Sequence, residues 1–153
     1  MEKNVKGDNV YFQIAWSPVA RFDKYKALGI PDIPGLICLL SEISASQIEY
    51  LLFYSCWRNG LRKGLREITN PLVSIFPGII GQVKNNTLLY KYTVIDRSVQ
   101  DMNDVMYWLI KEYLPVYNNS VDFCDSKRYR EIYMKESWMK DGDTVERIRK
   151  IDI

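Results

Sequence analysis

The sequence predicts a single α+β domain over residues 1–153, in which a small central mixed or antiparallel sheet is flanked by helices. Two kinds of segment support this fold class. Short runs rich in β-branched and aromatic residues are typical of strands, and longer runs with apolar residues three and four positions apart are typical of helices. The length fits one hydrophobic core, and no repeat or long linker divides the chain. The charged end of the chain, about residues 119–153, predicts a C-terminal helical extension.

Strand-forming runs follow one another through the first two thirds of the chain, after a polar start at residues 1–9 that we expect to be frayed. The run at 48–56 fits the second arm of a hairpin, although its nearly continuous apolar character does not exclude a helix. The predicted strands are Val10–Trp16, Gly35–Leu40, Ile48–Cys56 and Thr87–Ile95.

The helical pattern is clearest between Arg58 and Ile68, where leucine or isoleucine recurs on one face and Asn59 can cap the start. Gly64 lies in the middle of this helix, where it costs about 1 kcal/mol relative to alanine. A long helix begins at a cap at Asp96 or Ser98 and ends by Leu114, because Pro115 cannot continue it. Further helices are predicted at Val19–Leu28, Lys127–Met139 and Asp143–Lys150, whereas Leu72–Gly81 fits no single element.

The composition excludes several classes of function. The chain has no histidine, so histidine-based metal sites and Ser-His-Asp catalysis are excluded, and we expect no cofactor. The three cysteines, Cys38, Cys56 and Cys124, are isolated, which favours reduced thiols and a cytoplasmic protein. No apolar run has the about 18–20 residues of a membrane span, and we expect no membrane partner. A net charge of +2 does not by itself indicate nucleic-acid binding.

Three motifs occur in an order that resembles the GIY-YIG nuclease domain, the module of excision-repair nuclease subunits and homing endonucleases. PGLI at 34–37 stands where the family has P-G-I/V-Y. YSC at 54–56, followed by NGLRKGLRE at 59–67, resembles the Y-I/V-G segment and the basic helix after it. LIK at 109–111, with Pro115, Tyr117 and Asn118, resembles the L-I-K-x-x-x-P-x-Y-N that ends the domain. The resemblance covers about residues 33–118 and implies the family's small sheet flanked by helices.

The resemblance also implies a catalytic set of two tyrosines, an arginine, a metal-binding glutamate and an asparagine. A carboxylate holds a divalent cation against the phosphate, and an arginine fork clamps the phosphate oxygens. Carried onto this sequence, Tyr54 and Asn118 are retained as vestigial candidates. The first tyrosine falls on Ile37, or on Tyr50 if the hairpin alignment slips. The family's glycine falls on Cys56, its arginine on Gly64 and its glutamate on Met106, so a Mg²⁺ site is expected only if nuclease activity survives elsewhere.

A cluster of cations on the predicted helix is the main binding candidate, and Trp57 beside it could stack on a base. Its members are Arg58, Arg62, Lys63 and Arg66. The hypothesis is therefore a catalytically inactive or strongly impaired GIY-YIG-like protein that binds DNA or RNA. The alternatives are a protein-interaction module, such as an inhibitor or assembly factor, and an active nuclease with a relocated site. Each feature also has a structural interpretation: a solvated helix face, a core tryptophan, a hydrogen-bonded tyrosine and an asparagine bonded to backbone.

Overall fold

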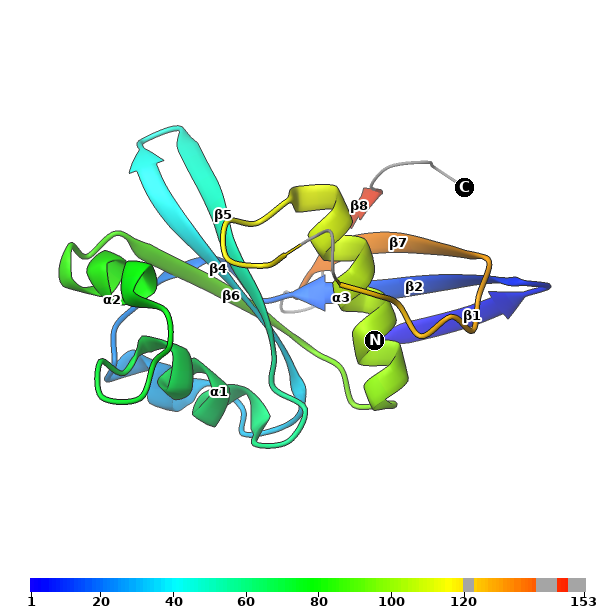
Figure 1. Ribbon diagram of the computed structural model, residues 1–153, viewed down its shortest axis with the longest axis horizontal. Coiled ribbons are helices and arrows are strands. Elements are labelled where there is room, and N and C mark those ends of the chain that lie inside the picture. Colours follow the sequence, from blue (N-terminus) through cyan, green and yellow to red (C-terminus); the bar gives the residue numbers. More distant parts are fainter. Residues whose placement is uncertain (120–122, 140–145, 149–153) are drawn as a thin grey trace.

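The computed structural model describes residues 1–119, 123–139 and 146–148. Within these residues the chain forms two four-stranded sheets, three α-helices and one 3₁₀ helix. The predicted α+β class is therefore confirmed. Figure 1 shows the helices gathered around one sheet, while the second sheet extends to the other side of the molecule.

The central sheet is antiparallel, with strand order β3-β6-β4-β5. Helices α1 (Gly60–Thr69) and α2 (Pro77–Lys84) lie on one side of it and α3 (Val99–Tyr113) on the other (Figure 1). The predicted sheet flanked by helices is thus present, and residues 48–56 do form the second arm of a hairpin. The strands are β3 (Ala20–Arg21), β4 (Gly35–Ser44), β5 (Gln47–Ser55) and β6 (Leu88–Val94).

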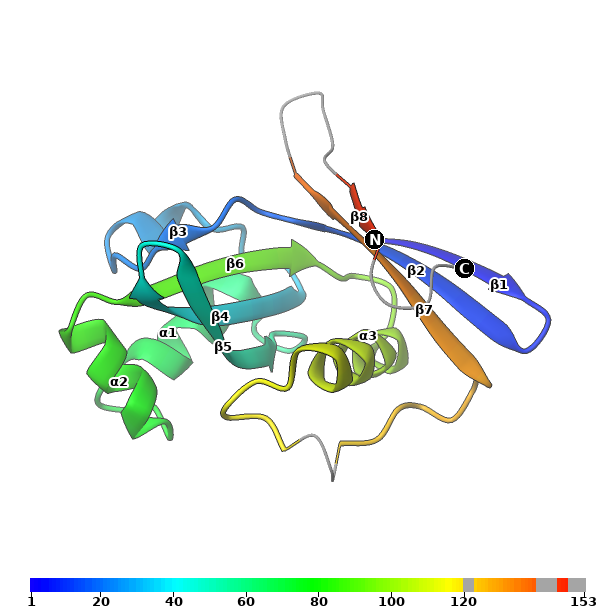
Figure 2. The same cartoon turned by 90° about the horizontal axis from the view of Figure 1, so that it is seen from above.

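The second sheet contradicts the predictions for both ends of the chain. Its order is β1-β2-β7-β8, and β2 and β7 run parallel although they come from opposite ends of the sequence (Figure 2). The start of the chain is not frayed, because β1 pairs with β2 across a tight turn at Gly7, whose φ of 59° suits glycine. The strands are β1 (Glu2–Lys6), β2 (Asn9–Trp16), β7 (Glu131–Trp138) and β8 (Glu146–Ile148).

The predicted C-terminal helical extension is wrong over the described residues. The helix expected at 127–139 is strand β7, and residues 146–148 of the second expected helix are strand β8, while the rest of that helix lies outside the described residues. Pairing with β2 along its whole length overrides the local helical tendency of the charged segment.

Two further segments differ from their predictions. The short helix expected at 19–28 is instead β3, which pairs with β6, followed by the 3₁₀ helix η1 (Lys26–Gly29). The unassigned stretch at 72–81 is a loop followed by α2, whose first residue is Pro77, a position where proline's missing N–H costs nothing.

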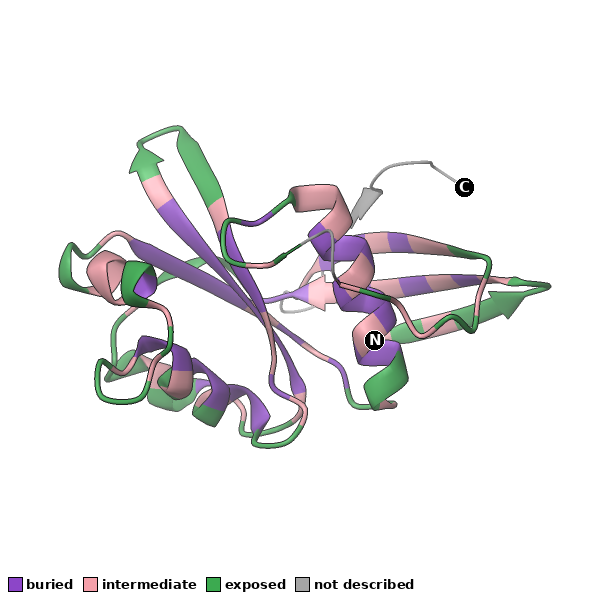
Figure 3. Ribbon diagram, viewed as in Figure 1, coloured by how far each residue is buried: buried purple, intermediate pink, exposed green. Residues whose placement is uncertain are grey.

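The buried residues form two clusters, one on each face of the central sheet (Figure 3). One cluster lies between the first face of the central sheet and α1, α2 and η1. The other joins the opposite face to α3 and to the second sheet. The predicted cap of α3 is present, since the Ser98 Oγ accepts a hydrogen bond of 3.0 Å from the Asp101 N–H, and α3 ends at Leu114 in a left-handed conformation before Pro115.

Candidate functional site

A cleft lies where β5 ends and α1 begins, and it has a volume of about 330 Å³. Tyr54, Trp57, Arg58 and Asn59 are among its lining residues, together with Glu67 from one face of α1. The cleft therefore brings together several residues that the sequence singled out, which are Tyr54, Cys56, Trp57, Arg58, Asn59 and Gly64. Three of the five catalytic positions that the resemblance implies, Ile37, Met106 and Asn118, do not line it.

The carboxylate of Glu67 organises the polar side of this cleft. It accepts a hydrogen bond of 2.9 Å from the Tyr54 hydroxyl and another of 2.9 Å from the Asn59 amide. Asn59 stands at the N-cap position of α1 but makes no capping hydrogen bond with its side chain. Burial, followed by the hydrogen bond to the Glu67 carboxylate, raises the pKa of Tyr54 to about 12. The phenol is therefore protonated near neutral pH and poorly suited to accept a proton from water.

Cys56 and Gly64 touch one another where α1 packs on the end of β5. A Cβ atom added at Gly64 would overlap the Cys56 Sγ and would lie 3.0 Å from the Cys56 Cβ. A side chain at position 64 is therefore incompatible with the Cys56 side chain in this position. Burial, with a smaller contribution from the Glu67 charge, raises the pKa of the Cys56 thiol to about 12, so the thiol is unreactive.

Ile37 and Met106 lie on opposite faces of the central sheet. Ile37 is fully buried in the cluster beneath α1, and Met106 is buried in the cluster beneath α3. Both positions are filled by apolar packing. Neither position lines the Tyr54 cleft, and Asn118 does not line that cleft either.

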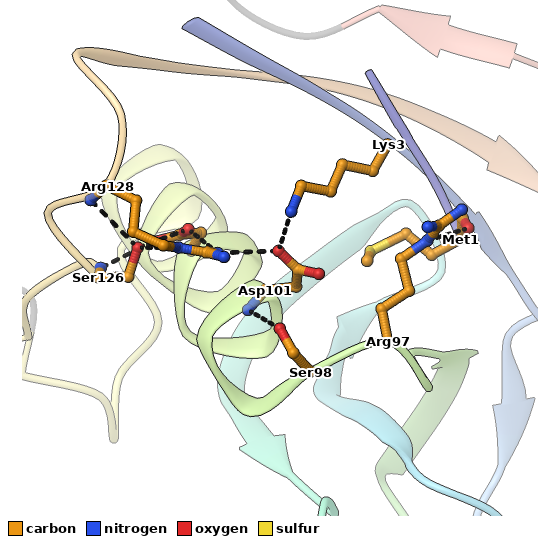
Figure 4. Close-up of polar contacts among 8 residues, drawn as sticks. Met1, Lys3, Arg97, Ser98, Asp101, Ser126 and Arg128 are labelled. Atoms are coloured by element: carbon orange, nitrogen blue, oxygen red, sulfur yellow. Dashed lines mark hydrogen bonds and ion pairs between the residues drawn. The ribbon is translucent and has the colours of Figure 1, made fainter. Parts of the chain in front are cut away.

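The acidic residues nearest to Met106 along α3 are bound by side chains and backbone from other segments (Figure 4). Asp101 forms ion pairs with Lys3 and Arg128 at 2.9 and 2.8 Å. Asp104 pairs with Arg128 at 2.7 Å and accepts hydrogen bonds from Ser126. These two carboxylates hold α3 against β1 and the segment before β7, and no group of three potential metal ligands is found among the described residues.

Asn118 has a structural role at the free edge of β5. Its Oδ1 accepts a hydrogen bond of 2.7 Å from the Phe53 N–H, and its Nδ2 donates one of 3.0 Å to the Phe53 carbonyl. The backbone before it continues the pairing, because the N–H of Tyr117 donates to the Leu51 carbonyl at 2.8 Å. We call residues 116–118 the edge segment, because they form hydrogen bonds with the outer edge of β5, the last strand of the central sheet.

The members of the predicted basic cluster do not share one surface. Arg58 faces the Tyr54 cleft, whereas Arg62 and Arg66 line a second, smaller cleft against η1, with Lys24 on its other wall. Lys63 is exposed and lines neither cleft. Trp57 is half-buried and packs against the cluster beneath α3, so its ring is partly core. Lys24 was not predicted as a binding residue, although the sequence has a lysine on each side of an aromatic residue, at positions 24 and 26.

The cations in and just before α1 and η1 differ in their partners from four cations elsewhere in the described residues. Lys3, Arg21, Lys127 and Arg128 each form an ion pair with a carboxylate. Six cations of α1, of η1 and of the residues just before these helices form no ion pair over residues 1–119, 123–139 and 146–148. They are Lys24, Lys26, Arg58, Arg62, Lys63 and Arg66. Their charges are therefore available to an anionic partner.

The fold and the two clefts define an α+β protein with a cation-rich helix on one face of its central sheet. The chain matches, over residues 1–152, a protein family described as "Uncharacterised protein", and it belongs to that family. Neither a curated protein nor a solved structure matches it. None of the helices in the described part of the chain is long and apolar enough to cross a membrane.

Proposed function

We propose that the protein is a catalytically inactive relative of the GIY-YIG nucleases and that it binds nucleic acid through the cations of α1 and η1. The observation that carries the proposal is the set of six cations without carboxylate partners among the described residues. Phosphate groups release bound counterions when such cations replace them, which is the main source of affinity in nonspecific nucleic-acid binding.

The order of elements supports the relationship to the nucleases. The hairpin β4–β5, α1, β6, α3 and the edge segment come in the order that the resemblance requires, with α2 as an additional helix between α1 and β6. The loss of catalysis follows from the side chains at the expected positions. Gly64 has no guanidinium, Met106 has no carboxylate and is packed in the core, and the Tyr54 phenol holds its proton.

The proposal can be tested by fluorescence anisotropy, which measures the binding of short labelled DNA and RNA, both single- and double-stranded. The affinity is measured at about 50 and about 200 mM salt. We expect the affinity to fall steeply with salt. Lys63→Gln should weaken binding to every sequence and reduce the slope of log K against log salt by about one phosphate contact. Lys6→Gln is the matched control, because Lys6 is an exposed cation on β1 in the other sheet.

Two results would contradict the proposal. The absence of salt-dependent binding at micromolar protein would remove the nucleic-acid function. Plasmid nicking that requires Mg²⁺ or Mn²⁺ and is lost in Tyr54→Phe would show that the protein is an active nuclease.

A second candidate function, a protein-interaction module on the same scaffold, is favoured by the loop between α1 and α2. This loop exposes 89% of Leu72, 60% of Val73 and 81% of Ile75. It is also ordered by local hydrogen bonds, since the Ser74 hydroxyl donates to the Ile68 carbonyl and accepts from the Phe76 N–H. Three exposed aliphatic side chains on an ordered loop fit an apolar pocket of a partner protein. Salt-independent association that is lost in Leu72→Ser would favour this function over the first.

A further inference from the structure

We propose that the cleft between η1 and α1 binds the terminal phosphate of a nucleic-acid strand. The proposal rests on the nucleic-acid binding proposed above and assigns a specific ligand group to one part of that surface. The cleft has a floor of apolar side chains and three cations among its lining residues, and the others are apolar or neutral. The lining residues are Phe22, Lys24, Ala27, Leu28, Arg62, Leu65, Arg66 and Thr69.

The basic residues of this cleft favour a bound anion. Lys24 comes from the segment before η1, while Arg62 and Arg66 lie one turn apart on α1, so three basic residues line the same hollow. No acidic residue lines the cleft, and none of the three forms an ion pair among the described residues. Like charges that share a partly enclosed space repel each other, and a bound anion offsets this repulsion because it attracts each of the cations.

Arg62 is held in place before any ligand arrives. Its Nε donates a hydrogen bond of 3.1 Å to the carbonyl of Ile30, the residue that follows η1, and Ile30 itself is buried. This bond uses one of the five donors of the guanidinium and leaves those of the two terminal nitrogens. A fixed guanidinium fork suits phosphate oxygens, because less side-chain entropy is lost when it binds.

The size and shape of the cleft favour a strand end over a phosphate within a strand. Its volume of about 70 Å³ is several times the about 10–15 Å³ that one water molecule requires, which leaves room for a group of phosphate size. A phosphate monoester carries a charge of about −1.5 to −2 at pH 7 and three strong acceptor oxygens. A diester within a strand carries one negative charge and has chain on both sides. Three cations around a small hollow therefore fit the monoester better.

Oligonucleotides of one sequence with a 5′-phosphate, a 3′-phosphate or hydroxyls at both ends test this assignment in a competition binding assay. We expect at least one phosphorylated form to bind about tenfold more tightly than the hydroxyl form, as charge-assisted hydrogen bonds would provide. Arg62→Lys keeps the charge but removes the fork, and it should abolish most of this preference. Lys24→Gln, on the other wall, is a second variant that does not depend on the contact between Arg62 and Ile30.

Lys63→Gln is the matched variant for these measurements, because Lys63 lies on α1 outside the cleft. It should weaken the binding of all the oligonucleotides equally and leave the ratio of affinities between the phosphorylated and hydroxyl forms unchanged. Salt-dependent binding with equal affinities for the three forms would overturn the assignment of the cleft and leave the nucleic-acid function standing. If no form binds at all, both proposals fail.

Discussion

Replacement of Gly64 by alanine should destabilise the protein although alanine is the better helix former. In an open helix interior the change stabilises by about 1 kcal/mol. Here the new Cβ would overlap the Cys56 Sγ, and rotation of the thiol would still leave the Cys56 Cβ only 3.0 Å away. Overpacking of this kind costs about 1–3 kcal/mol, so we expect a net loss of about 1 kcal/mol in the free energy of unfolding.

The reasoning is tested most directly by a double-mutant cycle with Cys56→Gly. That variant alone should lose about 1–2 kcal/mol, because it removes a buried side chain and adds backbone freedom. In its background, however, Gly64→Ala meets no obstacle and should stabilise by about 1 kcal/mol. The coupling between the two positions should therefore be about 2 kcal/mol, within the range found for side chains in contact.

Urea unfolding followed by tryptophan fluorescence measures all four corners of the cycle, provided that the dependence on urea stays the same. Gly81→Ala is the control, because Gly81 is also in a helix and its added Cβ would have nothing within 4 Å. It should stabilise by about 1 kcal/mol in both backgrounds. Equal effects of Gly64→Ala with and without Cys56 would refute the packing argument. These are the positions at which the sequence resemblance places the family's arginine and glycine, so their coupling tests whether the packing of Cys56 excludes a side chain at position 64.

Three further predictions concern the residues that hold α3 and the edge segment in place. Arg128→Met should cost about 3 kcal/mol in urea unfolding, since it leaves the fully buried Asp104 without its cation, and an unchanged midpoint would contradict this. Burial raises the pKa of Asp101, but hydrogen bonds from Lys3 and Arg128 outweigh it and lower the pKa below the usual value. The stability that Asp101 adds is therefore full above about pH 4 and is lost as the pH falls through the lowered pKa, and thermal unfolding of Asp101→Asn should lack that part of the acid dependence. Asn118→Ala should cost about 1–2 kcal/mol and speed hydrogen exchange of the Phe53 amide, whereas unchanged exchange would show that Asn118 does not hold the edge segment.

The elements that sequence patterns predicted are those with a regular apolar period. Helices α1 and α3 bury one face each, and the strands of the hairpin and β6 are rich in strand-forming residues, so local pattern and final structure agree. The proline at 115 correctly marked the end of α3. In these segments neighbouring residues in the chain carry enough information to fix the element.

The mistaken predictions concern segments whose structure depends on distant partners. Strand β7 contains Glu136, which is buried and accepts hydrogen bonds from the Trp16 indole and the Tyr113 hydroxyl. From the sequence alone, a glutamate is expected to be exposed, so its burial in a strand could not be predicted. The polar β1 is likewise held by its pairing with β2 and by the ion pair of Lys3 with Asp101.

Only part of the candidate site was predictable from the sequence, because three of the five positions that the resemblance implies lie away from the Tyr54 cleft. The motif order correctly indicated that Tyr54 and Gly64 lie together at one cleft. The sequence allowed two interpretations of Asn118, a remnant of a catalytic site or an asparagine bonded to backbone. The structure supports the second, because Asn118 bonds to the backbone of β5. The division of the basic helix between two clefts could not be foreseen, because it depends on where η1 packs.

The parallel pairing of β2 with β7 has a consequence for the order in which the protein can fold during synthesis. Trp16 and its hydrogen-bond partner Glu136 are 120 residues apart. At the usual rates of translation, about 5–20 residues per second, the ribosome needs on the order of ten seconds to make the chain between them. Until then β2 has β1 on one side and an open edge on the other. The second sheet is thus completed last, after the segments that form the central sheet and its helices have already been made.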